Sequence, residues 1–188
     1  MKLRLRAVAA SMLLIALSIG SAAFAQKQGG ILRTYDPDCP GGLSIQEEAT
    51  VFARGPIMGV FNNLIMYDQH LPQNSLVSIV PDLATSWAWD EEGTELTFQL
   101  RQGVKFHDGK PFTAKDVKCT WDLRMDLAPQ KLRINPGKSG YYNLAEVTTN
   151  GDWEVTFHLK RPQPAFPMLL ADGFAPVYPS YFPPRDMR

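Results

Sequence analysis

The chain has 188 residues, 45% of them hydrophobic and 20% charged, a balance that supports a globular domain with one modest core. Three of its 19 basic residues lie before residue 26, so the remainder carries 16 basic against 19 acidic residues, a net charge of −3. A mildly acidic chain is a poor binder of nucleic acid, and this class of function is excluded.

The first 25 residues have the three parts of a secretory signal peptide. These are a positive end (Lys2, Arg4, Arg6), an apolar run (residues 7–20) and an A-x-A cleavage site (Ala23-Phe24-Ala25). The apolar run is shorter than the roughly 20 residues that a membrane-spanning helix needs. We therefore expect cleavage before Gln26 and export to the periplasm.

The next segment alternates short predicted elements with loops. In chain order these are a strand at residues 29–34, a proline-containing loop at 36–42, a helix from Pro56 onward, and an exposed polar connector at 67–78. The helix is predicted because apolar residues recur at positions 57, 60, 61 and 64, the spacing of one helical face, and because proline suits a first helical turn.

Two β-hairpins of one design are predicted further along. Residues 86–89 and 96–100 flank a turn at Glu91-Glu92-Gly93, and residues 146–149 and 153–159 flank Asn150-Gly151. The side chains expected to face a core are Leu96, Phe98 and Leu100 in the first hairpin and Val155, Phe157 and Leu159 in the second. Because a single hairpin is marginally stable, we expect the two to join one sheet.

A capped helix is predicted between the hairpins. Asp108-Gly109 turns the chain, Thr113 is the expected N-cap, and Asp116 completes a capping-box-like pair. The expected apolar face consists of Ala114, Val117, Trp121 and Met125, and the wet face of Lys115, Lys118, Asp122 and Asp126. This helix should lie against the sheet.

The cysteines and aromatic residues leave alternatives open. Cys39 and Cys119 are a disulfide pair or two free thiols, and we favour thiols because Cys119 falls at a semi-apolar position of the predicted helix. The four tryptophans, Trp87, Trp89, Trp121 and Trp153, are expected in the core. Tyr141-Tyr142 is either a pair of exposed rings that meets a partner or part of a hydrophobic lid.

Motifs for catalysis, metal binding and cofactor binding are missing from the sequence. His70, His107 and His158 have no metal-ligand spacing, and His158 is expected to be a solvated surface residue. Gly137-Lys138-Ser139 lacks the upstream glycine of a phosphate loop, because position 132 is Leu132. We therefore predict no catalytic residue, no metal site and no cofactor.

Four stretches, in order, carry a resemblance to a known family. The specific ones are PDLATSW (81–87) and LTFQLRQGVKFHDGKPFTAKDV (96–117), and the weaker ones are GGIL (29–32) and VTFHLKRP (155–162) with Pro164 and Phe166. Together they resemble the N-terminal part of the family 5 extracellular solute-binding proteins of ABC transporters, which include oligopeptide- and dipeptide-binding proteins. The resemblance implies an α/β (mixed α+β) chain with the type II periplasmic-binding-protein fold, incomplete here.

The same resemblance implies a division of the chain and a function. The expected parts are a signal peptide (1–25), the start of lobe I (26–65), an accessory lobe of hairpins and capped helix (66–170) and a truncated return connector (171–188), with the second ligand-binding lobe missing. The expected function is capture of peptides or similar small solutes and delivery to an ABC transporter membrane permease, by a protein that is monomeric at full length. Ligand contact is expected at Thr50, Val51 and Phe52, where the family has a ligand-lining segment, and an ordinary loop is the alternative there.

Two other functions remain open from the sequence. One is a secreted hydrolase, and the other is a non-catalytic β-rich adhesion or structural module. The solute is also open, since peptides, nickel complexes and oligosaccharides are all taken by proteins that resemble this one.

Overall fold

The computed structural model describes residues 30, 31, 33, 35, 37–39, 41, 42, 44, 46–48 and 50–187. The chain divides into two compact units, Met1–Tyr35 and Asp36–Arg188, and the elements below belong to the second unit. The predicted signal peptide lies outside the described residues, as does half of the strand predicted at residues 29–34. Gly30, Ile31 and Arg33, which are described, are not in a strand.

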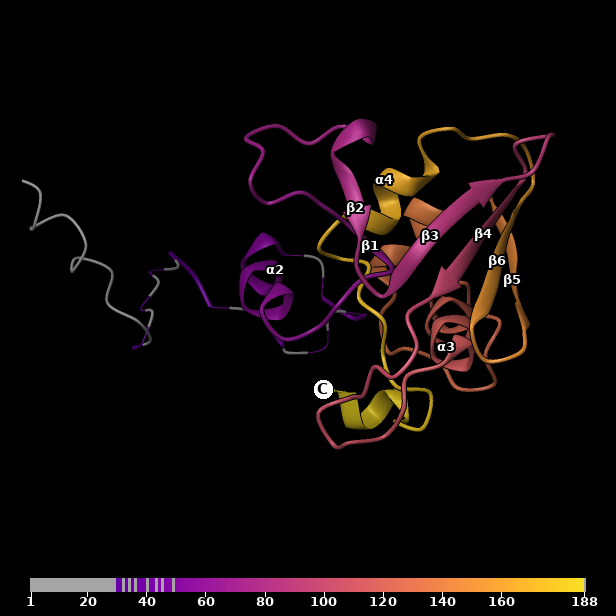
Figure 1. Cartoon of the computed structure of the whole chain (residues 1–188). Helices are drawn as coiled ribbons and strands as arrows, with labels where there is room; N and C mark the ends of the chain where they lie inside the picture. The colour runs from indigo at the N-terminus through magenta and orange to yellow at the C-terminus, as the bar shows by residue number, and fades with distance from the viewer. Residues whose placement is uncertain are drawn as a thin grey trace, which may run out of the picture. The chain divides into compact units, whose positions relative to one another are not determined.

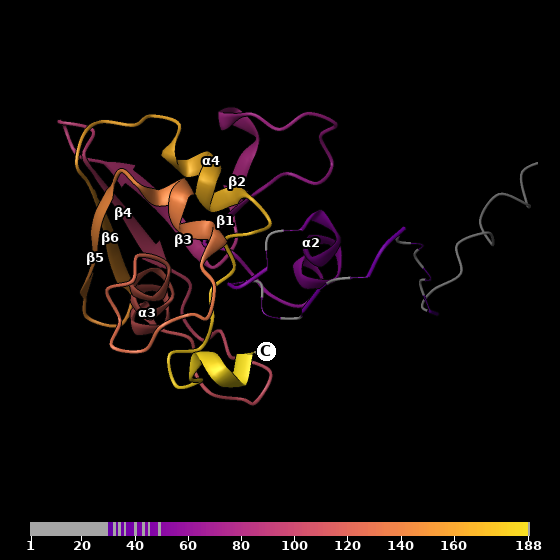
Figure 2. The ribbon, with the colours of Figure 1, turned by 180° about the vertical axis from the view of Figure 1, so that it is seen from behind.

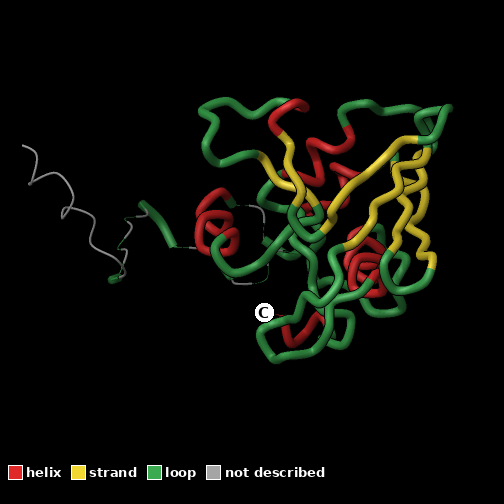
Figure 3. Tube along the Cα trace, viewed as in Figure 1, coloured by secondary structure: helices red, strands yellow, loops and turns green. Residues whose placement is uncertain are grey.

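The second unit combines short helices with two antiparallel sheets (Figures 1 and 3). In order, the elements are α2 (Val51–Met58), β1 (Ile65–Tyr67), the 3₁₀ helix η1 (Leu76–Ser78), β2 (Ile79–Pro81), β3 (Ala84–Trp89), β4 (Glu95–Leu100), α3 (Ala114–Arg124), the 3₁₀ helix η2 (Pro136–Tyr141), β5 (Leu144–Asn150), β6 (Glu154–Leu159), α4 (Phe166–Ala171) and the 3₁₀ helix η3 (Pro184–Met187). β1 pairs with β2, and the other four strands form one sheet. The sequence did not predict β1, β2 or α4.

The expected sheet of two joined hairpins is confirmed. β3 pairs with β4 and β5 with β6, and the hairpins meet through β4 and β6, which gives the strand order β3-β4-β6-β5. Across that junction Leu96 pairs with Phe157 and Phe98 with Val155, and all four side chains are fully buried. Gly151 has a φ of +66°, the left-handed conformation that an Asn-Gly hairpin turn requires.

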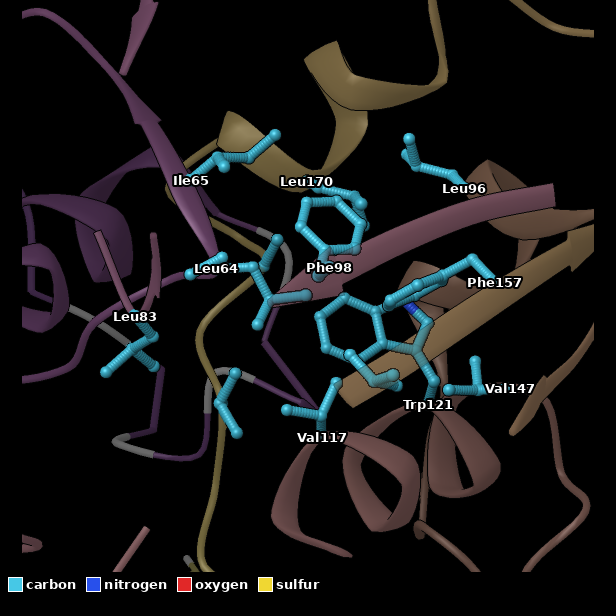
Figure 4. Packing of buried hydrophobic residues seen from close by; sticks show 14 of the residues in the cluster. Leu64, Ile65, Leu83, Leu96, Phe98, Val117, Trp121, Val147, Phe157 and Leu170 are labelled. Atoms are coloured by element: carbon cyan, nitrogen blue, oxygen red, sulfur yellow. The ribbon is translucent and has the colours of Figure 1, made fainter. Parts of the chain in front are cut away.

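α3 covers the apolar face of this sheet and begins where the sequence predicts. The backbone N–H of Thr113 donates to Asp116 Oδ2 at 2.8 Å, as in a capping box. Val117 and Trp121 are fully buried, and the Trp121 ring packs edge-on against Phe157 with 5.0 Å between centroids. Figure 4 shows this indole beside Phe157 in the centre of the core, and Figure 2 shows α3 against β5 and β6.

The other face of the sheet is polar, and one expectation about it needs correction. The hydroxyl groups of Thr97 and Thr156 lie 2.8 Å apart on adjacent strands. His158, expected to be solvated, is half-buried, with Nε2 2.7 Å from Thr148 Oγ1 and Nδ1 3.2 Å from Glu95 Oε1. Cross-strand hydrogen bonds therefore hold this imidazole against the sheet.

The helix predicted from Pro56 is wrong in its position. α2 spans Val51–Met58 with Pro56 inside it, and the helix ends at Gly59. Residues 59–60 form a turn and residues 61–63 have no regular secondary structure, and the carbonyl of Asn63 accepts a hydrogen bond from the backbone N–H of Leu83 at 3.0 Å. Glycine and asparagine are poor helix formers, so this long-range pairing prevails over the local apolar periodicity.

The segment after α4 is packed into the structure. Ala175, Val177 and Tyr178 are at most 5% exposed. The backbone N–H of Tyr178 donates to Thr120 Oγ1, in the middle of α3, at 3.0 Å. The expected return connector therefore lies along α3.

A second, smaller core joins α2 to α3. Its fully buried members are Ala53 and Ile57 of α2, Leu123 of α3 and Tyr178. The Phe61 ring stacks on Tyr178 with 4.7 Å between centroids. This cluster sets the position of α2 beside the end of α3.

The aromatic residues only partly follow the expectation of core packing. Trp121 is fully buried, whereas Trp87, Trp89 and Trp153 are half-buried against the core. The two neighbouring tyrosines differ in burial, because Tyr141 is 5% exposed and Tyr142 is 61% exposed.

Candidate functional site

A pocket with charged walls opens where the end of α3, η2 and the segment after α4 meet. Its volume is about 260 Å³. The residues that line it are Glu48, Arg124, Pro136, Gly137, Ser139, Gly140, Tyr141, Leu169, Asp172 and Phe174. Pockets that bind small molecules typically combine apolar walls with a few polar groups that orient the ligand, and this pocket has both.

Arg124, the last residue of α3, supplies the positive charge of the pocket. Its side chain is 3% exposed, its Nη2 donates to the carbonyl of Phe174, and its Nε, which is itself buried, has no hydrogen-bond partner among the described residues. The guanidinium lies over the Tyr141 ring, 5.7 Å from the centroid. Burial lowers the pKa of Arg124, but a guanidinium stays protonated in proteins, so the wall carries a buried cation.

The end of α3 explains how Arg124 becomes covered. The last carbonyls of a helix lack partners within it, and here Asn135 Nδ2 donates to the carbonyl of Arg124 at 2.9 Å. This bond holds η2 against the helix end, so that a β-carbon on Gly137 would lie 3.0 Å from Arg124 Nη1. A glycine at this position leaves room for the guanidinium.

Two carboxylates share the pocket with Arg124. Asp172 Oδ1 lies 3.5 Å from Arg54 Nη2 and accepts a hydrogen bond from the backbone N–H of Phe174 at 3.0 Å. Glu48 Oε1 accepts from the backbone N–H of Thr50 at 3.0 Å. The site therefore presents both signs of charge to a solute.

α2 is seated tightly beside this pocket. The Arg54 guanidinium lies 4.5 Å from the centroid of the Phe174 ring. A β-carbon on Gly173 would stand 2.5 Å from Met58 Sδ and 2.7 Å from Arg54 Cγ, closer than real contacts allow. Because Gly173 has no side chain, α2 can pack closely against the pocket wall.

The three residues expected to contact ligand lie at the start of α2. Thr50 is the N-cap and is exposed, Val51 is 64% exposed, and Phe52 is half-buried. Thr50 lies two positions after Glu48 in the chain, but the pocket walls do not include these three residues. Their contact with ligand stays a prediction.

The sequence did not point to Arg124 or Asp172. A basic residue in the last turn of a helix complements the helix dipole and is ordinarily exposed. The burial of Arg124 depends on η2 and on Phe174, which lie 11 or more positions along the chain. The only local signal is the glycine at 137, which the sequence shows as part of a loop.

A larger pocket, of about 400 Å³, lies between the His107-Asp108 turn and the segment around Tyr181. Its walls are mainly aromatic. The carboxylate of Asp108 accepts from Tyr181 Oη at 2.9 Å and pairs with Lys110 Nζ at 3.2 Å. Since this carboxylate is already engaged within the fold, the Arg124 pocket is the better candidate for orienting a polar solute.

The two cysteines and Lys138 show no arrangement that indicates catalysis or binding. Cys39 is an exposed free thiol and Cys119 a half-buried one, and burial, followed by nearby Asp122 and Asp116, raises the pKa of Cys119 and keeps it unreactive. Lys138, in the loop that resembled a phosphate site, pairs with Asp126 at 2.5 Å. Within the described residues, no group of three or more histidine, cysteine, aspartate or glutamate side chains is placed to hold a metal ion.

A search of the described part of the chain for membrane-spanning helices gave no helix of sufficient length and apolar character.

The family of the chain follows from comparison with known proteins. The model of the bacterial extracellular solute-binding proteins, family 5 Middle, matches residues 78–186, more than half of the chain. The chain therefore belongs to the family 5 solute-binding proteins. These are extracellular or periplasmic binding proteins of ABC transport systems and form no enzyme family.

Individual relatives support the same assignment. The dipeptide-binding protein of Escherichia coli K12 is 32% identical over 112 residues, which are 53% of this chain and 21% of that protein. The oligopeptide-binding protein AppA of Bacillus subtilis, solved with a nonapeptide, has a TM-score of 0.61 at 26% identity and is matched over 76% of this chain and 26% of its own. The binding protein AgaA of A. tumefaciens R10, solved with agropinic acid, has a TM-score of 0.63 at 24% identity over 75% of this chain and 26% of its own.

These likenesses confirm the expected fold class, the mixed α+β architecture of type II periplasmic binding proteins. The chain spans about a fifth of the length of the curated relatives it matches, at 21% and 18% for two of them.

Proposed function

We propose that this chain takes part in peptide uptake as the solute-binding component of an ABC importer, and that the Arg124 pocket contacts the solute. The observation that carries the proposal is the position of the pocket. Apart from Glu48, every residue that lines it lies within residues 78–186, the region that matches the family. The relatives named for dipeptide and oligopeptide binding support peptides as the solute class.

The chemistry of the pocket suits a short peptide. A peptide carries a positive amino group, a negative carboxylate and amide groups that need hydrogen-bond partners. The pocket presents a buried cation in Arg124, two anions in Glu48 and Asp172, and the aromatic wall of Tyr141. Groups of both signs orient such a solute, because each end of the peptide is attracted to a different wall.

The proposal also covers the organisation of the chain. Residues 1–25 act as the signal peptide, 26–65 begin lobe I, 66–170 form the accessory lobe and 171–188 return towards lobe I. The lobes close on the solute because it binds the closed state more tightly than the open one. The membrane permease of the importer is the partner that receives the solute.

Thr50, Val51 and Phe52 belong to this proposal as solute contacts. Two observations support them: their position in the chain shortly after Glu48, with Thr50 two residues on, and the exposure of Thr50 and Val51 at the start of α2. Backbone N–H groups in the first turn of a helix lack partners within the helix and are available to a carbonyl or carboxylate of the solute.

Calorimetry on the exported chain tests the function. The 188-residue chain is produced in a Gram-negative host, and mass spectrometry of the purified protein is expected to show a mature start at Gln26. Titration with dipeptides and tripeptides is expected to give saturable heat. Agropinic acid, a nickel–histidine complex and an α-galactoside represent the other solute classes. Binding of one of these alone would make the peptide class wrong, and silence across the panel would reject solute capture by this chain.

A further inference from the structure

The turn at residues 151–153, between β5 and β6, is bonded to two other elements. The carbonyl of Asp152 accepts a hydrogen bond from the backbone N–H of Ala114 at 2.9 Å, and the carbonyl of Trp153 accepts one from the N–H of Leu100 at 2.8 Å. Ala114 is the first residue of α3 and Leu100 the last of β4. Since N–H groups in the first turn of a helix have no partner within it, this turn holds the start of α3 in place.

Asn150 precedes this turn and is the only asparagine in the sequence that is followed by glycine. Both Asn150 and Gly151 are exposed. Apart from the chain neighbours of Gly151, nothing in the described chain lies within 4 Å of the place that a β-carbon on it would take. The Gly151 N–H forms no hydrogen bond within the part of the chain that the structure describes. The backbone nitrogen beside the Asn150 amide is therefore open and unhindered.

The two other exposed asparagines have a different surrounding. Asn74 precedes Ser75, but the Ser75 N–H donates to Ser78 Oγ at 2.8 Å in the capping box of η1. Asn62 likewise precedes a backbone N–H that donates to Asp82 Oδ2 at 3.0 Å. In both places a hydrogen bond engages the backbone nitrogen that follows the asparagine.

We propose that Asn150 is a modification site, at which the side-chain amide is lost by spontaneous deamidation in the folded chain. The Gly151 nitrogen loses its proton and attacks Cγ of Asn150, so that a C–N bond forms there and the Cγ–Nδ2 bond breaks. The proton goes to the departing nitrogen, which leaves as ammonia, and a cyclic succinimide remains. Water then adds to either ring carbonyl and opens the ring to aspartate or isoaspartate. The nearness of the two reacting groups favours ring closure, and water is the only other reactant.

The product changes the charge around Glu154. Asn150 Nδ2 donates to Glu154 Oε1 at 2.9 Å, and Gln99 Nε2 donates to Oε2 at 2.6 Å. These bonds, the one from Asn150 foremost, lower the pKa of Glu154, and the carboxylate is ionised at neutral pH. Deamidation replaces one donor by a second carboxylate, and the two like charges repel. The reaction therefore weakens the end of the hairpin.

Isoaspartate also changes the backbone. It carries the chain through its side-chain carbon, which adds a methylene group before Gly151. The pairing of Asn150 with Glu154 and the φ of +66° at Gly151 belong to a turn of ordinary length. A longer turn moves its carbonyls away from Ala114 and Leu100, so a reaction at one exposed residue loosens the start of α3. Because the ammonia is lost, the modified fraction grows with the age of the chain.

The first experiment measures the reaction in the folded protein. The purified chain is incubated in mildly alkaline buffer made with ¹⁸O-enriched water. Its peptides are compared by chromatography and mass spectrometry with synthetic standards that contain asparagine, aspartate or isoaspartate at position 150. We expect Asn150 to convert and to take up ¹⁸O, while Asn74 stays an amide. Conversion of Asn150 only in the urea-unfolded chain would overturn the proposal, as would equal conversion at Asn74.

Two variants serve as matched controls. Asn150→Gln keeps an amide at this position, but a glutamine side chain would have to close a larger ring, so this variant should stay unmodified. Asn150 does not have a positive φ, and the longer side chain therefore causes no backbone strain. Asn74→Gln should leave the conversion at Asn150 unchanged. Release of ammonia from Asn150→Gln at the rate of the unmodified chain would show that the reaction lies elsewhere.

The second experiment follows the consequence for α3. In the converted chain, protection of the Ala114 and Leu100 amides against hydrogen exchange is expected to fall about tenfold, the factor that corresponds to one lost hydrogen bond. The Leu127 amide, which donates to the carbonyl of Asp122 at 2.8 Å beyond the far end of α3, should keep its protection. An Asn150→Gln chain of the same age should keep all three. Undiminished protection of Ala114 and Leu100 in a converted chain would overturn the link between Asn150 and the start of α3.

Discussion

Tyr181 Oη donates a hydrogen bond of 2.9 Å to Asp108 Oδ1, and this bond joins the turn at residues 106–109 to the segment that follows Tyr178. The Lys110 ammonium group lies 3.7 Å from the centroid of the Tyr181 ring and 3.2 Å from Asp108 Oδ2. Three side chains thus hold together two segments that are distant in sequence. The titration of Tyr181 and Asp108 should report on this contact.

The first prediction concerns the loss of stability at alkaline pH. Desolvation, followed by the hydrogen bond to Asp108, raises the pKa of Tyr181 to about 12. Because the folded state holds this proton more tightly, the contribution of Tyr181 to stability is complete below about pH 10 and is lost as the pH rises towards 12. Titration of tyrosinate absorbance should show Tyr181 among the tyrosines that ionise late, together with Tyr67 and Tyr141, whose pKa burial also raises. Asp108→Asn should bring the pKa of Tyr181 down, and the exposed Asp152→Asn should not.

The same contact also predicts how the stability of the fold changes as the pH falls. Partial desolvation acts to raise the pKa of Asp108, but hydrogen bonds from the Lys110 backbone and the Tyr181 hydroxyl prevail and lower it. The stabilisation from Asp108 is therefore present above about pH 4 and is lost as the pH falls through the lowered pKa. The protection of residues 178–187 against hydrogen exchange, measured relative to the intrinsic rate at each pH, should fall in acid for the unmodified chain. A Tyr181→Phe variant that exchanges as slowly as the unmodified chain at neutral pH would contradict a role for this contact.

A second prediction addresses the capping box of α3. Thr113→Ala removes the N-cap and should lower the free energy of unfolding by about 1 kcal/mol. Asp116 is 2% exposed and accepts hydrogen bonds from the backbone N–H groups of Thr113 at 2.8 Å and Ser180 at 2.7 Å. Asp116→Ala should therefore cost more, about 2–3 kcal/mol, because buried donors lose a charged acceptor. Urea unfolding measures both, with the exposed Thr149→Ala as control. Equal stability of the unmodified chain and Thr113→Ala would reject this start for α3.

The elements that could be predicted are those with local causes. Asn150-Gly151 specifies a hairpin within a few residues, and alternation from Leu96 to Leu100 specifies which face is buried. Thr113 and Asp116 specify a helix start within one turn. In each case the residues that determine the element also lie in it.

The elements that escaped prediction depend on distant partners. The helix does not reach Asn63, whose carbonyl accepts a hydrogen bond from the backbone N–H of Leu83, and no sequence pattern near Pro56 predicts this pairing. Arg124 is buried because Asn135 holds η2 over it and Phe174 accepts its hydrogen bond. A candidate site built from segments before α2, after α3 and after α4 emerges only once these segments are folded together.

A third prediction concerns the close approach of α2 to the pocket wall. Gly173→Ala places a β-carbon 2.5 Å from Met58 Sδ, and overpacking of this kind typically costs about 1–3 kcal/mol. We expect reduced stability in urea and weaker peptide binding, because Arg54 and the start of α2 must move. Gly42→Ala is the control, since nothing lies within 4 Å of a β-carbon there. A Gly173→Ala protein as stable as Gly42→Ala would show that the neighbours yield without cost.

The final prediction tests the start of α2 as a solute contact. Val51 is 64% exposed in the first turn of the helix, where an aspartate is favourable to the helix dipole. Val51→Asp should therefore leave the free energy of unfolding unchanged or slightly raised. It should weaken dipeptide binding about tenfold or more, as replacement of a contact residue by a charge does. Val77→Asp, at a position 96% exposed in η1, makes the same chemical change away from the pocket and should bind like the unmodified chain. If the two variants bind a dipeptide equally well, Thr50, Val51 and Phe52 form an ordinary helix start, and the contacts of the solute with this chain lie within the Arg124 pocket alone.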